Sequence, residues 1–156
     1  MIKPLQGQFA DWQYARGNTI RFLELLSDED LNKKLPRKTF TTIYEQIAEM
    51  AWAQRCFLKA VEAKTIADMD WATPTFATKD DLLGEMKKFD AKMLEIFEAC
   101  DGTEEVDWYG SSKSIYEHIS SLQSHEMMHL GQITAFCYCL GIEIPQEINK
   151  SMFLTG

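Results

Sequence analysis

The sequence predicts an all-α protein, a four-helix bundle with a long connection between its second and third helices. Apolar residues recur every three to four positions in four long segments, and the alternation typical of strands is nowhere sustained. Turn and capping residues separate these segments. A length of 156 residues favours one domain, spanning 1–156, that is large enough to bury a core.

The first two long helices are expected at 5–26 and at about 42–67, where apolar residues fall at helical spacing. Between them, a turn at 27–30 starts a short helix that ends near Pro36. The two apolar stripes consist of Phe9, Trp12, Ile20, Leu23 and Leu26 in the first helix, and of Ile43, Ile47, Met50, Phe57 and Val61 in the second.

The third helix is expected after an irregular stretch around 71–76. It begins at Thr78, which forms a capping-box pattern with Asp81 in place of the usual glutamate, and Gly102 follows its end. The long connection before it would let the second and third helices run parallel.

The fourth helix is expected to follow residues 108–111. Ser114 and Glu117 form another capping-box pattern at its start, and Gly141 marks its end. The tail from 145 to 156 is expected to pack across one end of the bundle.

The composition excludes several classes of partner. The net charge is −8 and no cluster of Lys or Arg offsets it, so neither nucleic acid nor a membrane surface is expected as a partner. No apolar run approaches the ~20 residues of a membrane span, and residues 1–8 lack the core of a signal peptide. We therefore expect a cytoplasmic protein whose four cysteines are reduced thiols.

All three histidines lie on the fourth helix and share its apolar stripe. His118, His125 and His129 fall within about 40° of one another on a helical wheel. His125 and His129 are four residues apart, so they can chelate one divalent metal ion from one face of the helix. His118 lies two turns, about 10.5 Å, from His125 and is too distant to join them.

Two histidine ligands need at least a third ligand, and with no other His in the chain this must be Asp, Glu, Cys or solvent. Glu49 is the best candidate because it lies in an apolar part of the second helix, at the edge of its stripe. The small residues Ala53, Cys56 and Ala60 follow on the same face and leave room for an ion and a ligand. A solvent-exposed glutamate is the alternative interpretation.

Residues 125–129 read His-Glu-Met-Met-His, a match to the H-E-x-x-H zinc-protease motif. That motif would make Glu126 a general base acting on metal-bound water. However, Ala135 stands where an extended protease motif needs a third histidine, and no strand is evident to bind a peptide. The protease interpretation is therefore not favoured, and Glu126 is expected either to orient a histidine or to lie at the surface.

Two further residues are candidates for contacts with a substrate or cofactor. Gln132 lies beside the histidine face and is expected to hydrogen-bond a ligand. Arg16 shares the stripe of the first helix and is expected to meet an anionic substrate, although an arginine lying along the surface explains it as well.

Segments 42–54 and 124–133 resemble the second-helix and fourth-helix motifs of the DinB/YfiT-like proteins, in which two histidines four apart precede Gly-Gln. The resemblance covers essentially the whole chain. It implies a bundle with parallel second and third helices, a divalent metal bound through three histidines, and a homodimer. It also implies an activity on small-molecule substrates, since characterised relatives include transferases and isomerases that use low-molecular-weight thiols.

The two fourth-helix ligands of the family carry over to His125 and His129, and the second-helix histidine position carries over to Glu49. A carboxylate there departs from the family pattern but still suits Zn²⁺, Ni²⁺, Mn²⁺ or Fe²⁺. The resemblance favours a metal-dependent thiol S-transferase that uses a low-molecular-weight thiol. A metal-dependent hydrolase and a non-catalytic, metal- or ligand-binding dimer remain alternatives.

Overall fold

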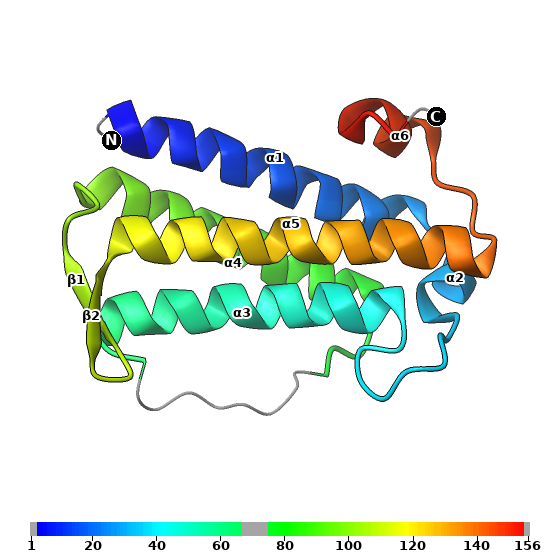
Figure 1. The fold of residues 1–156 in the computed structure, drawn as a ribbon, viewed down its shortest axis with the longest axis horizontal. Coiled ribbons are helices and arrows are strands. Elements are labelled where there is room, and N and C mark those ends of the chain that lie inside the picture. Colours follow the sequence, from blue (N-terminus) through cyan, green and yellow to red (C-terminus); the bar gives the residue numbers. More distant parts are fainter. Residues whose placement is uncertain (1–2, 67–74, 155–156) are drawn as a thin grey trace.

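The computed structural model describes residues 3–66 and 75–154. Four long helices form a bundle, which confirms the predicted all-α fold (Figure 1). The long helices are α1 (Lys3–Leu25), α3 (Ile43–Ala63), α4 (Lys79–Ala99) and α5 (Ile115–Leu140), and the short elements are α2 (Asp28–Asn32), β1 (Glu105–Trp108), β2 (Ser111–Ser114) and α6 (Gln146–Met152). None of the described helices combines the length and apolarity that a membrane crossing requires.

The second and third long helices, α3 and α4, run in the same direction, as the long connection between them allows (Figure 1). Helix α5 runs opposite to α3 and packs against both α1 and α3. The faces of α3 and α5 that meet inside the bundle are therefore the ones that position the candidate site.

Side-chain caps fix where three of these helices begin. Thr42 accepts a hydrogen bond from the Glu45 N–H in a full capping box at the start of α3, and Thr78 caps α4. Ser114 forms the predicted capping box with Glu117 at the start of α5. Helix α3 ends at Ala63, earlier than expected, because Lys64 turns into the left-handed conformation with φ 56°. The end predicted for this helix, and most of the irregular stretch after it, lie outside the described residues.

A β-hairpin closes the end of the bundle where α5 begins (Figure 1). Strands β1 and β2 pair antiparallel, with Trp108 opposite Ser111. Tyr109 and Gly110 form the turn, and their φ values of 53° and 82° suit the two-residue turns that match strand twist. The expectation of no strands was wrong here, because two four-residue strands are too short to show alternation.

The buried core divides into two hydrophobic clusters, one toward each end of the bundle. Along α5 one cluster ends at Leu122 and the other begins at Leu130. Most of the buried polar and histidine side chains described below lie between them. The largest fully buried side chains of the clusters are Trp12, Phe22, Phe97, Leu5, Leu23 and Leu31.

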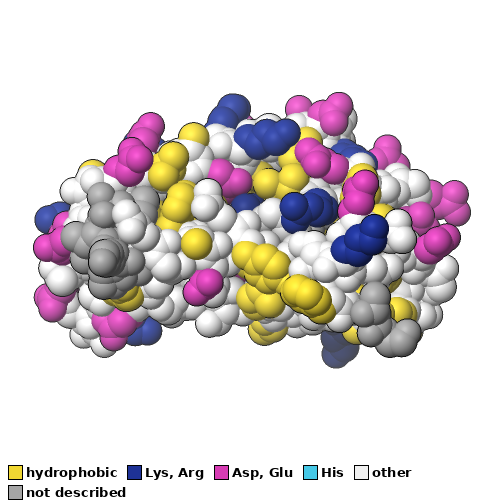
Figure 2. All heavy atoms as spheres, turned by 90° about the horizontal axis from the view of Figure 1, so that it is seen from above, with side chains coloured by type: hydrophobic (Ala, Val, Ile, Leu, Met, Phe, Trp, Pro, Cys, Tyr) yellow, Lys and Arg dark blue, Asp and Glu magenta, His cyan; other side chains and the backbone are white. Residues whose placement is uncertain are grey.

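The chain's tail forms α6, which packs against α1. The Tyr14 hydroxyl of α1 donates a hydrogen bond to the Ser151 carbonyl at 2.9 Å and links the two helices. Figure 2 shows hydrophobic side chains gathered near the middle of one face, among acidic and basic groups. Met127, Met128 and Tyr138 are exposed residues of α5, at 41%, 50% and 64%.

Candidate metal centre

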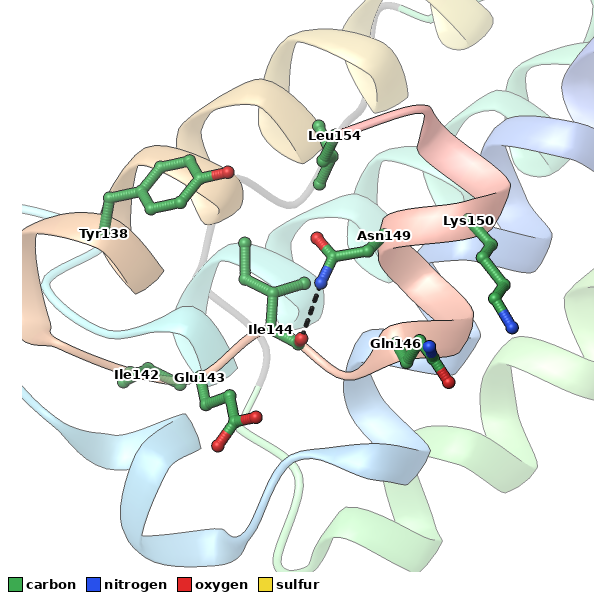
Figure 3. Close-up of a pocket in the computed structure, with 8 residues that line it drawn as sticks. All are labelled: Tyr138, Ile142, Glu143, Ile144, Gln146, Asn149, Lys150 and Leu154. Atoms are coloured by element: carbon green, nitrogen blue, oxygen red, sulfur yellow. Dashed lines mark hydrogen bonds between the residues drawn. The ribbon is translucent and has the colours of Figure 1, made fainter. Parts of the chain in front are cut away.

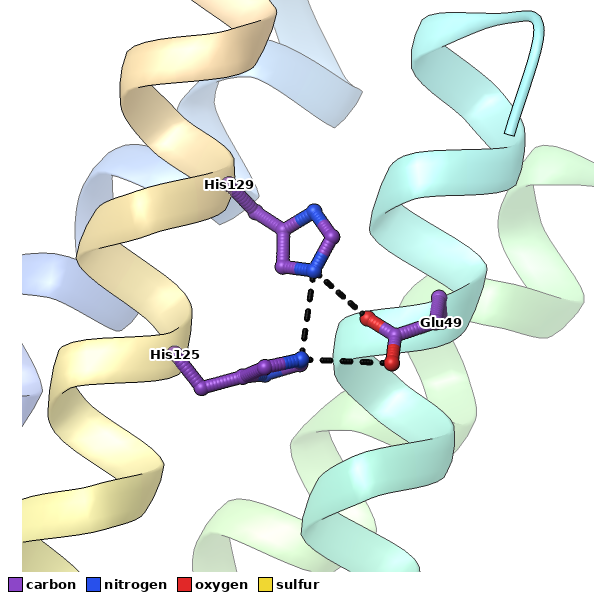
Figure 4. Close-up of side chains that lie close together, drawn as sticks. All are labelled: Glu49, His125 and His129. Atoms are coloured by element: carbon purple, nitrogen blue, oxygen red, sulfur yellow. Dashed lines mark hydrogen bonds and ion pairs between the residues drawn. The ribbon is translucent and has the colours of Figure 1, made fainter. Parts of the chain in front are cut away.

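Glu49 of α3 and both His125 and His129 of α5 point toward one another between the two helices (Figure 4). The two Glu49 carboxylate oxygens lie 3.2 Å from His125 Nε2 and 2.8 Å from His129 Nε2. The two Nε2 atoms are 3.2 Å apart. The structure thus brings together the three residues that the sequence singled out.

These distances fit one divalent ion. Two ligands about 2.0–2.2 Å from the same Zn²⁺ ion, at angles of about 90–110°, are themselves about 2.8–3.6 Å apart. The separations between the Glu49 oxygens and the two imidazoles fall inside this range. The donor set of two nitrogens and a carboxylate also suits such an ion. His129 is buried, whereas the His125 side chain is 28% exposed, so the open side of the triad lies at His125.

The Glu49 carboxyl is held in its ionised form. Burial by itself would raise its pKa, but hydrogen bonds with His125 and His129 outweigh burial and lower the pKa of Glu49 to about 2. An ionised carboxylate is the form that binds a metal ion, so Glu49 is ready to act as a ligand at neutral pH.

Gln46 fixes the orientation of His129, and sequence reasoning missed it. The Gln46 side chain is fully buried, and its Nε2 donates a hydrogen bond to the Phe40 carbonyl at 3.3 Å. Its Oε1 therefore faces His129 Nδ1, and because an amide oxygen can only accept, Nδ1 must donate. This leaves the Nε2 lone pair directed at the triad. The spacing of three residues between Gln46 and Glu49 on one helix is the signal that could have identified it.

Glu126 does not touch the triad. It is fully buried, accepts a hydrogen bond from the Thr19 hydroxyl at 2.6 Å, and pairs with Arg16 at 3.1 Å. The expectation that Glu126 orients a histidine or lies at the surface was wrong, because this buried cation on α1 binds it. A carboxylate engaged in this way is not placed to act as a general base beside His125 and His129, which removes the geometric basis of the protease interpretation.

Arg16 lies in the core at 2% exposure, between carboxylates from two other helices. Besides Glu126 it faces Asp90 of α4 at 3.5 Å, and Asp90 accepts a hydrogen bond from Gln54 of α3 at 3.0 Å. The four long helices are thus joined by one buried polar network. Burial raises the pKa of Asp90, although Arg16 opposes this. Binding of an anionic substrate by Arg16 stays a prediction, and it would require these ion pairs to open.

Gln132, the other candidate for a ligand contact, is half-buried on α5. Gln132 is not part of the cluster of Glu49, His125 and His129. Its role in hydrogen-bonding a ligand stays a prediction.

A pocket of about 310 Å³ adjoins the open side of the triad between α3 and α5. Ala53 and Cys56 line it, as the run of small residues on α3 predicted, whereas Ala60 does not. His118 lines it two turns from His125, consistent with the expectation that it is no ligand of the same ion. The lining residues are Glu49, Trp52, Ala53, Cys56, Phe57, Ile66, Trp108, His118, Ser121, Leu122 and His125.

A second hollow, of about 510 Å³, lies between the end of α5 and α6 (Figure 3). Tyr138 and Leu154 line it from opposite sides, and Asn149 donates a hydrogen bond to the Ile144 carbonyl at 2.9 Å beneath it. None of its lining residues belongs to the triad, so it has no part in the metal centre.

Comparison with known proteins agrees with this architecture. A DinB-like protein from Bacillus cereus ATCC 10987 superposes with a TM-score of 0.71 at 21% identity, over 90% of this chain and 95% of that one. A DinB-like protein from Bacillus subtilis superposes with a TM-score of 0.67 at 17% identity, over 89% of this chain and 96% of that one. A protein described as a putative DinB family member, from Exiguobacterium sibiricum 255-15, superposes with a TM-score of 0.71 at 16% identity. The match covers 95% of this chain and 99% of that one.

These solved structures share the fold of this chain. No curated protein sequence matches it. The sequence profile of the DinB superfamily, however, matches residues 11–133, which is most of the chain and includes all three residues of the triad. The chain therefore belongs to the DinB superfamily.

Proposed function

We propose that this protein holds a divalent metal ion with Glu49, His125 and His129 and uses it to transfer a low-molecular-weight thiol to a small electrophilic substrate. The observation that carries the proposal is that ligand atoms of these three residues lie as close to one another as atoms that bind one ion. One side of the cluster opens onto a pocket. Two imidazoles and one carboxylate leave coordination positions for an exogenous ligand.

The resemblance to DinB/YfiT-like transferases is what favours thiol transfer over hydrolysis. Glu49, His125 and His129 would hold the ion, which would supply Lewis acidity and so lower the pKa of a bound thiol. Among the described lining residues Glu49 is the one carboxylate, and it belongs to the triad. The ion would lower the pKa of a bound water as well as that of a thiol, so hydrolysis stays the alternative and the activity assay below decides between the two.

In the proposed reaction the thiol sulfur forms a bond to an electrophilic carbon of the second substrate. The bond from that carbon to its leaving group breaks, and the leaving group departs with the bonding electrons. The thiol proton is released to solvent. The protein's part is to orient the reactants: Gln46 keeps His129 in the correct tautomer, and the pocket beside His125 holds the body of the thiol.

We carry forward two expectations with this proposal. The exposed Met127, Met128 and Tyr138 on α5 offer an apolar surface for a second copy of the chain, in keeping with a homodimer. A reducing, cytoplasmic setting suits the four cysteines, none of which forms a disulfide in the described part of the chain. The mass measured by light scattering tests the first expectation.

Activity is tested by following conjugation of a bacterial low-molecular-weight thiol to a chromogenic electrophile. The wild type is compared with His129→Ala and with wild type stripped of metal by a chelator. The proposal predicts a thiol-dependent rate above background in the metal-loaded wild type alone. Equal rates in the wild type and His129→Ala reject a metal-dependent transferase.

A further inference from the structure

The pocket beside the triad is a groove two helical turns long. Glu49 faces His125 at one end. Cys56 follows Glu49 by seven residues on α3, and His118 precedes His125 by seven residues on the antiparallel α5, so each lies about 10.5 Å further along the groove. Trp108 of the hairpin lies at the far end, with its ring centroid 4.6 Å from that of His118.

The described walls of this groove are mainly apolar. They include no Lys or Arg, and their one acidic group, Glu49, belongs to the triad. Three aromatic side chains, Trp52, Phe57 and Trp108, contribute to the walls. Lys113 lies with its Nζ 5.7 Å from the Trp108 ring centroid and does not line the groove. A carboxylate or phosphate would therefore meet no counter-charge among the described lining residues, whereas an uncharged ring would find aromatic partners.

His118 supplies a polar group at the far end. It is 3% exposed, and its Nε2 has no hydrogen-bond partner within the described residues. Burial lowers the pKa of His118, although a hydrogen bond with the Val106 backbone opposes the shift, so the ring is neutral at pH 7. The hydrogen bond with Val106 favours the protonated form of His118, so the imidazole ring donates it. The neutral ring then keeps a lone pair on its other nitrogen, Nε2. A buried acceptor of this kind calls for a donor.

The volume of the groove limits the size of its occupant. A protein cavity of about 150 Å³ is known to hold one benzene molecule. This groove has about 310 Å³, roughly twice that volume, and opens onto the triad. It therefore has room for one or two rings beyond the atom that contacts an ion.

We propose that the groove binds an uncharged, aromatic small molecule whose metal-binding head lies at Glu49 and His125 and whose far end donates a hydrogen bond to His118. This inference rests on the metal centre proposed above and adds the ligand class. It predicts that the site prefers an apolar ligand to a charged, peptide-like thiol.

The test is isothermal titration of Zn²⁺-loaded protein with three thiols: benzyl mercaptan, 4-(mercaptomethyl)phenol and glutathione. Benzyl mercaptan should bind about tenfold or more tightly than glutathione, because its ring is buried in the groove. The phenol hydroxyl should add about fivefold through His118. That gain should disappear in His118→Phe.

Ala53→Phe fills the groove between the triad and Trp108 and should weaken benzyl mercaptan about tenfold or more. The matched control is Ala91→Phe on the exposed side of α4, which should bind as the wild type does. The Zn²⁺ content of each variant is measured alongside. A wild type that binds no Zn²⁺ overturns both proposals. A Zn²⁺-loaded wild type that prefers glutathione, or that is unaffected by Ala53→Phe, overturns only the ligand class.

Discussion

Replacement of Gln46 by Met tests whether this buried amide prepares His129 to bind metal. Methionine has a similar size but makes neither of the two hydrogen bonds, so His129 Nδ1–H and the Phe40 carbonyl lose their partner. Loss of a partner that orients a ligand histidine costs about 10–100-fold in metal affinity. This corresponds to about 1.4–2.7 kcal/mol, in line with the cost of an unpaired buried donor. We therefore expect the Zn²⁺ dissociation constant to rise by one to two orders of magnitude.

The assay is competition for Zn²⁺ against a chromophoric chelator of known affinity. Gln54→Met is the matched control, because Gln54 is equally buried on the same helix but hydrogen-bonds Asp90 and not a histidine of the triad. Both variants should lose stability by about 1–3 kcal/mol, and only Gln46→Met should lose metal affinity. Equal Zn²⁺ dissociation constants for the two variants would refute this role of Gln46.

Three further predictions concern stability, measured as the free energy of unfolding in urea. Arg16→Met should lower the free energy of unfolding by about 3–5 kcal/mol, because Glu126 becomes an unpaired buried charge. Adding Glu126→Leu should restore most of that stability, and a double variant no more stable than Arg16→Met contradicts this reasoning. Gly102→Ala should lower the free energy of unfolding by about 1–3 kcal/mol, since the φ of Gly102 is 86° and a Cβ would lie 2.8 Å from the Tyr116 ring. An unchanged free energy of unfolding contradicts this. Because burial lowers the pKa of His118, the unfolded chain takes up its proton first as the pH falls below about 6.5. Stability of the wild type should therefore decline from pH 7.5 to 5.5 more steeply than that of His118→Phe, by at most about 1.4 kcal/mol per pH unit, and equal slopes contradict this.

The features that could be predicted from the sequence are those encoded locally. Helical periodicity and capping residues such as Ser114 predict the long helices to within a few residues. The four-residue spacing of His125 and His129 places both on one face whatever the rest of the fold. Glu49 could be proposed as their partner because it is an acidic residue in an otherwise apolar stretch of helix.

The features that could not be predicted depend on contacts between distant segments. The pairing of Glu126 with Arg16 joins positions 110 residues apart, and the local pattern around Glu126 does not reveal its partner. The role of Gln46 requires both His129 and the Phe40 carbonyl, which come from other segments. The hairpin that brings Trp108 to the pocket is stabilised partly by hydrogen bonds between Asp107 and the residues just after α3, Lys64 and Ile66, which no local pattern reports.

The central claim is that Glu49, His125 and His129 together bind one divalent ion. Its most direct test is the metal content, by mass spectrometry of the elements, of protein dialysed against Zn²⁺ and then against metal-free buffer. The control is Glu62→Gln, which removes an exposed glutamate from the same helix. We predict about one ion per chain in the wild type and Glu62→Gln, and almost none in Glu49→Gln or His129→Ala. A wild type without bound metal, or a Glu49→Gln variant that retains a full complement, would contradict the claim.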